Sequence, residues 1–187
     1  RHVIGSVGTE VPGVEIQIRD EKGNMLEPNS AGEVCVRGPN IMKGYYNNVE
    51  GTRKAFWPGG WFRSGDVGVL DVNGYLFIVD RKKDMIISGG YNVYPRDIEE
   101  VLFEHPKVQE ATAIGIPHPH RGESVKVFVV LKEGARATAE ELMEFCSGKL
   151  AKYKWPTEIE FREELPKTNV GKVLKKDLRA MEQQKTK

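Results

Sequence analysis

The sequence predicts an α+β fold in two parts, a β-rich part over residues 1–82 and a small α+β part over residues 83–187. Up to about residue 80, short stretches alternate apolar and polar residues between Gly and Pro residues, which is typical of antiparallel strands. Beyond residue 84, apolar residues recur at helical spacing between further strands. The charged stretch "DRKKD" (80–84) separates the two patterns, as expected of a segment that joins two domains.

In the β-rich part, side-chain alternation marks the strands and turn sequences separate them. Val14, Ile16 and Ile18 share one face of a first strand. The sequence "EKGN" (21–24) indicates a turn after it. Further on, "DVNG" (71–74) lies between the apolar runs "VGVLD" and "YLFIVD" and predicts that they form a hairpin.

The α+β part begins with the runs "DMIIS" and "YNV", which predict a short strand pair around Gly89 and Gly90. Pro95 suits the first position of the helix that follows. Two longer strands are expected at about 108–116 and 124–131, where apolar residues again occupy alternate positions.

The later elements are a capped helix, a short strand and a terminal helix. Thr138 and Glu141 form the sequence pattern of a capping box, and Leu142 and Cys146 lie on the apolar stripe of the helix that they open. A strand near 158–161 and a last helix complete the part.

Composition places the chain among ordinary soluble globular proteins. It has 187 residues, of which 39% are hydrophobic and 29% charged, enough for one modest core or two small ones. A net charge of +1 gives no long-range field, so we expect no nucleic-acid partner. No apolar run approaches the roughly 20 residues of a membrane span. The start "RHVIGSVG" has no signal-peptide pattern and no initiator Met. We therefore expect a cytoplasmic protein, and a fragment of a longer one.

The cysteines and the closely spaced histidines favour structural roles over metal binding. Cys35 and Cys146 lack metal-ligand spacing, and we predict buried, reduced thiols. His118 and His120, in "PHPHRGE" (117–123), have no acidic or Cys partners in sequence, and we interpret this stretch as a loop between strands. The sequence thus predicts no metal site.

The stretch "LPKTNVGKVLKKDLR" (165–179) delivers Lys172 on a Pro-bounded loop ahead of a short helix. A phosphate-cradling loop would require Gly in place of Pro166 and Ser or Thr in place of Val173, and neither requirement is met. On this stretch alone, a solvated lysine in a basic tail is the simpler interpretation.

Four stretches together carry a family resemblance. They are "GEVCVRGPNIMKGYYN" (32–47), "WFRSGD" (61–66), "DRKKDMIISGGYNVYPRDIEE" (80–100) and "LPKTNVGK" (165–172). In this order and spacing they resemble the acyl-adenylate-forming (AMP-binding) superfamily, which includes acyl-CoA ligases, firefly luciferase and the adenylation domains of peptide synthetases. "GGYNVYP" is most similar to the fatty-acyl-CoA ligase branch.

The resemblance implies a two-step reaction. A carboxylate, a fatty acid in the most similar branch, attacks the α-phosphate of ATP to give acyl-AMP and pyrophosphate, and the thiol of CoA then displaces AMP. The implied ligands are ATP or AMP, CoA and Mg²⁺. The implied domains are the last β-rich part of the large adenylating domain (1–82) and the small mobile domain (83–187). The phosphate loop, the magnesium ligand and the acyl pocket are expected outside this fragment, so we expect the fragment alone to be inactive.

Asp66 and Arg81 are the nucleotide-binding residues that the resemblance implies. A carboxylate can accept hydrogen bonds from both ribose hydroxyls, and Asp66 matches the family residue in this role. Ser64 stands where the family usually has Thr and keeps the hydroxyl group. Arg81 follows at the family distance and offers a planar set of donors to the same ribose.

The resemblance assigns three further roles in the small domain. Lys83 matches the hinge about which this domain rotates between the two half-reactions. Gly89 and Gly90 match a channel for the pantetheine arm of CoA, although a tight β-turn would also explain them. Lys172 matches the catalytic lysine, whose ammonium relieves the repulsion between the carboxylate and the α-phosphate during adenylation. We expect its loop to be mobile, because the lysine is withdrawn before the second step.

Two further sequence features resemble ligand-binding residues, but we assign no binding role to them. Glu10 in "VGTEV" (7–11) mimics the magnesium-binding Thr-Glu of the family, but the aromatic-Gly start of that motif is absent, so we expect a loop residue. Lys152 and Lys154 could meet CoA phosphates, although cations after a helix are also explained by the helix dipole.

Two alternative functions stay open from the sequence. One is an adenylation domain that loads the phosphopantetheine of a carrier protein. The other is a non-catalytic module that binds CoA or a protein partner. The presence of Asp66, Arg81 and Lys172 argues against a module that has lost its chemistry.

Overall fold

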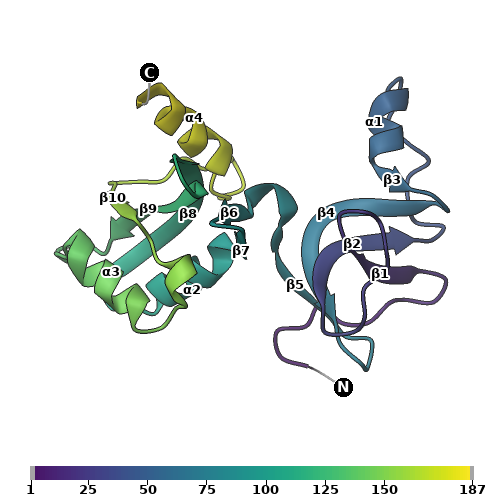
Figure 1. Cartoon of the computed structure of the whole chain (residues 1–187), viewed down its shortest axis with the longest axis horizontal. Coiled ribbons are helices and arrows are strands. Elements are labelled where there is room, and N and C mark those ends of the chain that lie inside the picture. Colours follow the sequence, from purple (N-terminus) through teal and green to yellow (C-terminus); the bar gives the residue numbers. More distant parts are fainter. Residues whose placement is uncertain (1–2, 186–187) are drawn as a thin grey trace. The chain divides into compact units, whose positions relative to one another are not determined.

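The computed structural model describes residues 3–185 of the chain. It divides into two compact units, residues 1–83 and 84–187, with the boundary between Lys83 and Asp84. We call them the N-terminal unit and the C-terminal unit. Both contain strands and helices (Figure 1), as the predicted α+β class requires.

The N-terminal unit is built on one antiparallel sheet. Its strands are β1 (Glu15–Arg19), β2 (Ala31–Arg37), β3 (Phe56–Trp57), β4 (Trp61–Leu70) and β5 (Leu76–Arg81). They follow the order β1-β2-β4, and both β3 and β5 pair with β4. The predicted hairpin is therefore confirmed as β4–β5, and Ile18, Val34 and Leu76 form the buried core of this sheet.

The short helix α1 (Val49–Lys54) is absent from the sequence-based expectation. None of its residues is buried, so there is no apolar stripe to detect. Its first turn is held by Asn48, whose Oδ1 accepts a hydrogen bond from the Gly51 N–H at 2.7 Å. Local capping rather than packing defines this helix.

The C-terminal unit contains a second sheet of five strands and three α-helices. The strands are β6 (Ile86–Ser88), β7 (Tyr91–Val93), β8 (Val108–His118), β9 (Gly122–Leu131) and β10 (Glu158–Phe161). The helices are α2 (Pro95–Phe103), α3 (Ala139–Ser147) and α4 (Lys175–Lys185), with 3-10 turns η1 (Lys82–Asp84), which crosses the unit boundary, and η2 (Lys152–Lys154). The sheet order is β10-β9-β6-β7, β8 pairs antiparallel with β9, and β10 runs parallel to β9.

Helices cover both faces of this second sheet (Figure 1), and a separate core lies under each face. Under α2 and α3 the buried residues are Ile86, Val93, Ile98, Leu102, Val108, Ala111, Ala113, Val125, Val127, Val129, Leu142 and Cys146. On the α4 side they are Ile114, Phe128, Val130, Leu165 and Leu178. Strand β9 is thus buried on both faces, whereas its alternating sequence predicts one apolar face.

Several local expectations are confirmed. Pro95 opens α2, and the Thr138 side chain caps α3 by accepting a hydrogen bond from the Glu141 N–H at 3.2 Å. Cys35 and Cys146 are buried free thiols, and burial raises the pKa of each to about 11. Within residues 3–185, no helix has the length and apolar composition that a membrane crossing requires.

Candidate functional site

Asp66 and Arg81 form a register pair across the β4–β5 hairpin of the N-terminal unit. Arg81 Nη1 lies 2.8 Å from Asp66 Oδ1, and 27% of the Asp66 side chain and 56% of the Arg81 side chain are exposed. Ser64 Oγ accepts a hydrogen bond from the Asp66 N–H at 3.0 Å. Gly65 has a φ of +74°, which favours glycine between them. The fold thus joins the two residues that the sequence assigns to a nucleotide and leaves both accessible.

A buried carboxylate, which the sequence did not indicate, lies on strand β2 of the same sheet. Glu33 is 5% exposed, and its Oε2 lies 3.0 Å from both Arg63 Nη2 and Lys82 Nζ. Burial raises the pKa of Glu33, but the hydrogen bonds from Arg63 and Lys82 outweigh it and hold the pKa below its ordinary value. Lys82 is thereby anchored to the N-terminal unit.

Lys83 is exposed and lies between two anchored residues. Lys82, before it, pairs with Glu33 inside the N-terminal unit. Asp84, after it, pairs inside the C-terminal unit with Arg179, whose Nη2 lies 2.8 Å from Asp84 Oδ1. The segment that connects the two compact units without an anchor in either is therefore about one residue long.

Gly89 and Gly90 form the two-residue turn between β6 and β7. Their φ angles are +59° and +84°, so the turn itself requires residues that tolerate left-handed backbone. A Cβ at either position would meet nothing within 4 Å. Backbone conformation, not close packing within the chain, accounts for both glycines, and the space above them is open.

A cavity of about 470 Å³ adjoins Gly89 within the C-terminal unit. Tyr91 and Tyr153, on its wall, stack with ring centroids 4.6 Å apart at an interplanar angle of 18°. Arg121 and Lys152 bring two exposed cations to the same wall. An aromatic stack beside two cations suits a ligand with a flat ring and phosphate groups.

The structure distinguishes Lys152 from Lys154, both of which the sequence left as possible contacts of CoA phosphates. Lys154 Nζ lies 2.6 Å from Asp97 Oδ2, so its charge is neutralised inside the protein. Lys152 lines the cavity and is exposed. The stretch interpreted only as a β8–β9 loop contributes Arg121, whose carbonyl oxygen also accepts a hydrogen bond from the Gly89 N–H at 2.9 Å. This backbone contact joins residues that are distant in sequence, so no local sequence pattern indicates it.

Lys172 lies on a hydrogen-bonded hairpin (residues 165–174). The Thr168 N–H donates to the Lys172 carbonyl oxygen at 2.8 Å, and the Lys172 N–H donates to Thr168 Oγ1 at 3.1 Å. Gly171 closes the turn with a φ of +81°, and Leu165 at its base is 3% exposed. The backbone is thus ordered by its own hydrogen bonds, where the sequence suggested a mobile loop.

Two lysines close to Lys172 in the sequence are each paired with a carboxylate. Lys167 Nζ lies 2.6 Å from Glu110 Oε1, and Lys175 Nζ lies 2.8 Å from Glu99 Oε1. The Lys172 side chain is exposed and has no hydrogen bond or ion pair with any residue in the part of the chain that the structure describes. Its ammonium is available to a ligand.

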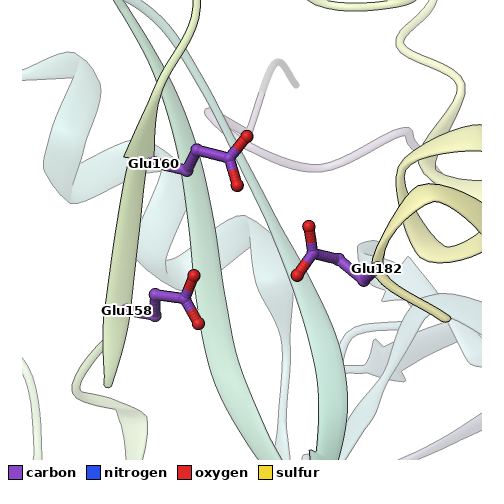
Figure 2. A group of neighbouring side chains, drawn as sticks. All are labelled: Glu158, Glu160 and Glu182. Atoms are coloured by element: carbon purple, nitrogen blue, oxygen red, sulfur yellow. The ribbon is translucent and has the colours of Figure 1, made fainter. Parts of the chain in front are cut away.

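Within residues 3–185, one group of three acidic side chains is close enough to resemble a metal site. Figure 2 shows Glu158 and Glu160 of β10 and Glu182 of α4 directed towards one another. The Nζ atom of Lys126 contacts all three carboxylates, at 2.9 Å from Glu160 and 2.7 Å from Glu182. Lys185 and Arg162 also pair with these carboxylates, so that three cations balance the three negative charges. These residues therefore do not fit a magnesium ion.

The charge balance of this cluster is reflected in its pKa values. Burial lowers the pKa of Lys126, which is 1% exposed, but the hydrogen bonds that its ammonium donates to the three glutamates outweigh this effect and raise the pKa well above its usual range. Burial raises the pKa of Glu160, yet its bonds to Lys185 and Lys126 lower it to about 2. Lys126 and Glu160 therefore stay ionised at neutral pH, and the ion pairs of the cluster join β9, β10 and α4.

Comparison with known proteins identifies the family. Residues 97–172 match the family model of the AMP-binding enzyme C-terminal domain, and residues 1–46 match that of the AMP-binding enzyme. The chain is 50% identical over 175 residues to a long-chain-fatty-acid–CoA ligase of Bacillus subtilis. The matched region covers 93% of this chain and 31% of that relative. It is 44% identical over 172 residues to an oxalate–CoA ligase of Arabidopsis thaliana, covering 92% of this chain and 33% of the relative.

Solved structures agree with these sequence matches. ATP-bound MatB of Rhodopseudomonas palustris has a TM-score of 0.92 and 39% identity, covering 97% of this chain and 36% of that chain. The o-succinylbenzoate CoA synthetase MenE of Bacillus subtilis, in complex with its acyl-adenylate intermediate, has a TM-score of 0.86 and 38% identity, covering 94% and 36%. The fold of this chain is thus the one that the corresponding parts of these enzymes share. The chain belongs to the AMP-binding enzyme family, as its motifs predict, and spans about a third of the length of the curated relatives that it matches.

Proposed function

We propose that this chain is the C-terminal part of an ATP-dependent acyl-CoA ligase. Residues 1–82 would then belong to the large adenylating domain and residues 83–187 would form its small mobile domain. The observation that carries the proposal is Lys172, an exposed lysine without a partner among the described residues, on a hydrogen-bonded hairpin flanked by the paired Lys167 and Lys175. A lysine of a merely solvated tail would not require this ordered support.

In the adenylation step, the two units would contribute different groups. The Asp66 carboxylate accepts hydrogen bonds from the ribose hydroxyls of ATP, and Arg81, 2.8 Å away, holds that carboxylate in place. The Lys172 ammonium stabilises negative charge on the α-phosphate while the anionic substrate carboxylate approaches. Mg²⁺, which supplies further charge neutralisation on the phosphates when bound, would be held by residues outside this chain.

The second step would use the cavity beside Gly89. The open turn at Gly89 and Gly90 leaves room for the thin pantetheine arm, and the Tyr91–Tyr153 stack offers a surface to a purine ring. Arg121 and Lys152 would pair with phosphate groups. CoA carries an adenine nucleotide and the phosphopantetheine of a carrier protein does not. The aromatic and cationic wall therefore favours CoA over the carrier-protein alternative.

Lys83 is the residue about which the C-terminal unit would rotate between the two steps. Anchored neighbours on either side leave its backbone as the place where torsion can change without breaking an ion pair. Because the Lys172 hairpin is ordered, rotation of the whole unit is also the simplest way to withdraw this lysine after adenylation.

A fatty acid is the proposed substrate, because the relative at 50% identity is a long-chain-fatty-acid–CoA ligase. An oxalate–CoA ligase matches nearly the same length of chain at 44% identity. Relatives that act on very different acids thus share this region, which indicates that the acyl pocket lies elsewhere in the protein.

The experiment uses a chimeric ligase, in which this chain replaces the matching segment of the Bacillus subtilis relative. Pyrophosphate release is measured with acids from oxalate to long-chain fatty acids, and thioester formation is compared with CoA and with 4′-phosphopantetheine as acceptors. We expect acid-dependent pyrophosphate release and a marked preference for CoA, and no release from the isolated chain. Equal use of both acceptors would instead support carrier-protein loading, and an inactive chimera that still binds CoA would support the non-catalytic module.

A further inference from the structure

Helix α4 directly follows the Lys172 hairpin and has an unusual inner face. Leu178 is the buried residue of this helix. Lys175, Arg179 and Glu182 are spaced four and three residues apart, so they lie on one side of the helix together with Leu178. Each of the three forms an ion pair with a different part of the C-terminal unit. Charges, rather than an apolar stripe, make most of the contacts of this face.

The three ion pairs are well shielded from solvent. Lys175 pairs with Glu99 of α2 at 2.8 Å, with 16% and 17% of the two side chains exposed. Arg179 pairs with Asp84 at 2.8 Å, and Glu182 pairs with the buried Lys126 at 2.7 Å. Partly buried ion pairs contribute little net stability, because desolvation offsets the attraction, but they specify geometry.

The pair nearest to Lys172 in the sequence is supported by further hydrogen bonds to Glu99. Besides Lys175, Glu99 Oε1 accepts hydrogen bonds from Thr112 Oγ1 at 3.0 Å and from the Ala113 N–H at 2.9 Å. Strand β8 therefore fixes this carboxylate before Lys175 reaches it. Lys175 is three residues from Lys172, and the Leu174 N–H between them donates to the Pro166 carbonyl oxygen at 2.7 Å.

We propose that Glu99 and Lys175 are positioning residues for adenylation. They fix the first turn of α4, and thereby the end of the hairpin that presents Lys172. The proposal rests on the proposed role of Lys172. Leu178 alone could hold the helix near the sheet, but an apolar contact has no direction and tolerates sliding. A charged hydrogen bond to a carboxylate that β8 already holds does not.

Lys175→Met in the chimeric ligase removes the ion pair and keeps most of the side-chain length. The rate of adenylation at saturating ATP should fall by about ten-fold to a hundred-fold, the range that a small misplacement of a catalytic group produces. KM for ATP should be unchanged, because Asp66 and Arg81 are untouched. Thioester formation from synthetic acyl-AMP and CoA should also be unchanged. Lys175→Arg should restore adenylation, since the guanidinium can still pair with Glu99.

Lys176→Met is the matched control, because Lys176 is the adjacent exposed lysine and the change in net charge is identical. It should leave both half-reactions unaltered. Equal effects of the two substitutions, or equal slowing of both half-reactions by Lys175→Met, would overturn the proposal. Lys172→Ala is measured in parallel. If it leaves adenylation intact, the proposed function fails; if it slows adenylation while Lys175→Met does not, the positioning role alone fails.

Discussion

At the scale of single residues, the motifs predict a nucleotide-binding role for Asp66 and Arg81, but not the ion pair between them. The two lie on different strands, and the β4–β5 register brings them together. Glu33 and Lys126 could not be predicted, because a charged residue inside a strand pattern indicates a solvent face while these two are buried by distant partners. Local sequence thus predicts candidate residues that belong to a motif, and it misses buried charged residues whose partners are distant in sequence.

Asp66→Ala in the chimeric ligase should weaken ATP binding, because two hydrogen bonds to the ribose are lost, each worth about 1.5–3 kcal/mol when the acceptor is charged. The ATP dependence of pyrophosphate release measures the effect. Glu27→Ala, at an exposed acidic residue of the same unit, serves as the control and should change nothing. An unaltered ATP dependence in the Asp66 variant would leave this carboxylate with a structural role in the hairpin.

Glu160→Gln should reduce the free energy of unfolding of the chain in a pH-dependent manner. The pKa of Glu160 is lowered from 4.5 to about 2, so its ionised form stabilises the fold above about pH 4.5, and this contribution is lost as the pH falls towards 2. The shift corresponds to about 3 kcal/mol near neutral pH.

Denaturant unfolding at a series of pH values tests this expectation. The difference between the original chain and Glu160→Gln should be large at pH 7 and should shrink between pH 4.5 and 2. Glu163→Gln, at an exposed glutamate beyond the end of β10, is the control. A difference that stays constant over this range would show that the ion cluster does not account for the stability.

At the scale of elements, strands and helices with one apolar face are predicted well. The cap of α3 appears in the structure as expected, whereas β9, whose sequence predicts one apolar face, is buried on both faces. Helix α1 is missed, because it has no buried residue and so no apolar periodicity that a sequence pattern can reveal. The terminal helix α4 is predicted, but the ion pairs through which it docks are not.

Salt should loosen α4 more than α3. The screening length falls to about 3 Å at 1 M salt, so the pairs that the exposed Lys185 of α4 makes with Glu160 and Glu182 weaken, whereas the buried Leu142 and Cys146 of α3 are not charged. Amide hydrogen exchange of the chain, followed at low and high salt, measures the opening of both helices in one sample. The same salt response in both would contradict an ionic docking of α4.

At the scale of the whole molecule, the change of pattern in "DRKKD" marks the region where the structure divides. The sequence suggests a boundary between residues 82 and 83, and the compact units meet between Lys83 and Asp84. Periodicity reveals that two folding patterns exist. It cannot reveal that Lys82 and Asp84 are each anchored within their own unit, since both partners are distant in sequence.

Lys83→Pro in the chimeric ligase should separate the two half-reactions. Proline fixes φ near −65°, a value that suits the 3-10 turn in which Lys83 lies and opposes other backbone states. One half-reaction should proceed at its original rate and the other should stall. Glu21→Pro, in the exposed turn after β1, is the control for proline itself. Unimpaired overall thioester synthesis by the Lys83 variant would exclude this residue as the hinge.

The central claim is that the C-terminal unit serves adenylation through Lys172 and thioester formation through the cavity beside Gly89. Measuring both half-reactions in two variants of the chimeric ligase, Lys172→Ala and Arg121→Met, tests it most directly. Lys172→Ala should slow adenylation by about 10²–10³-fold, the cost of one lost charge-stabilising donor, and leave thioester formation from synthetic acyl-AMP unchanged. Arg121→Met should leave adenylation unchanged and raise KM for CoA. If each variant impaired both half-reactions to the same extent, the division of labour between the two sites would be contradicted.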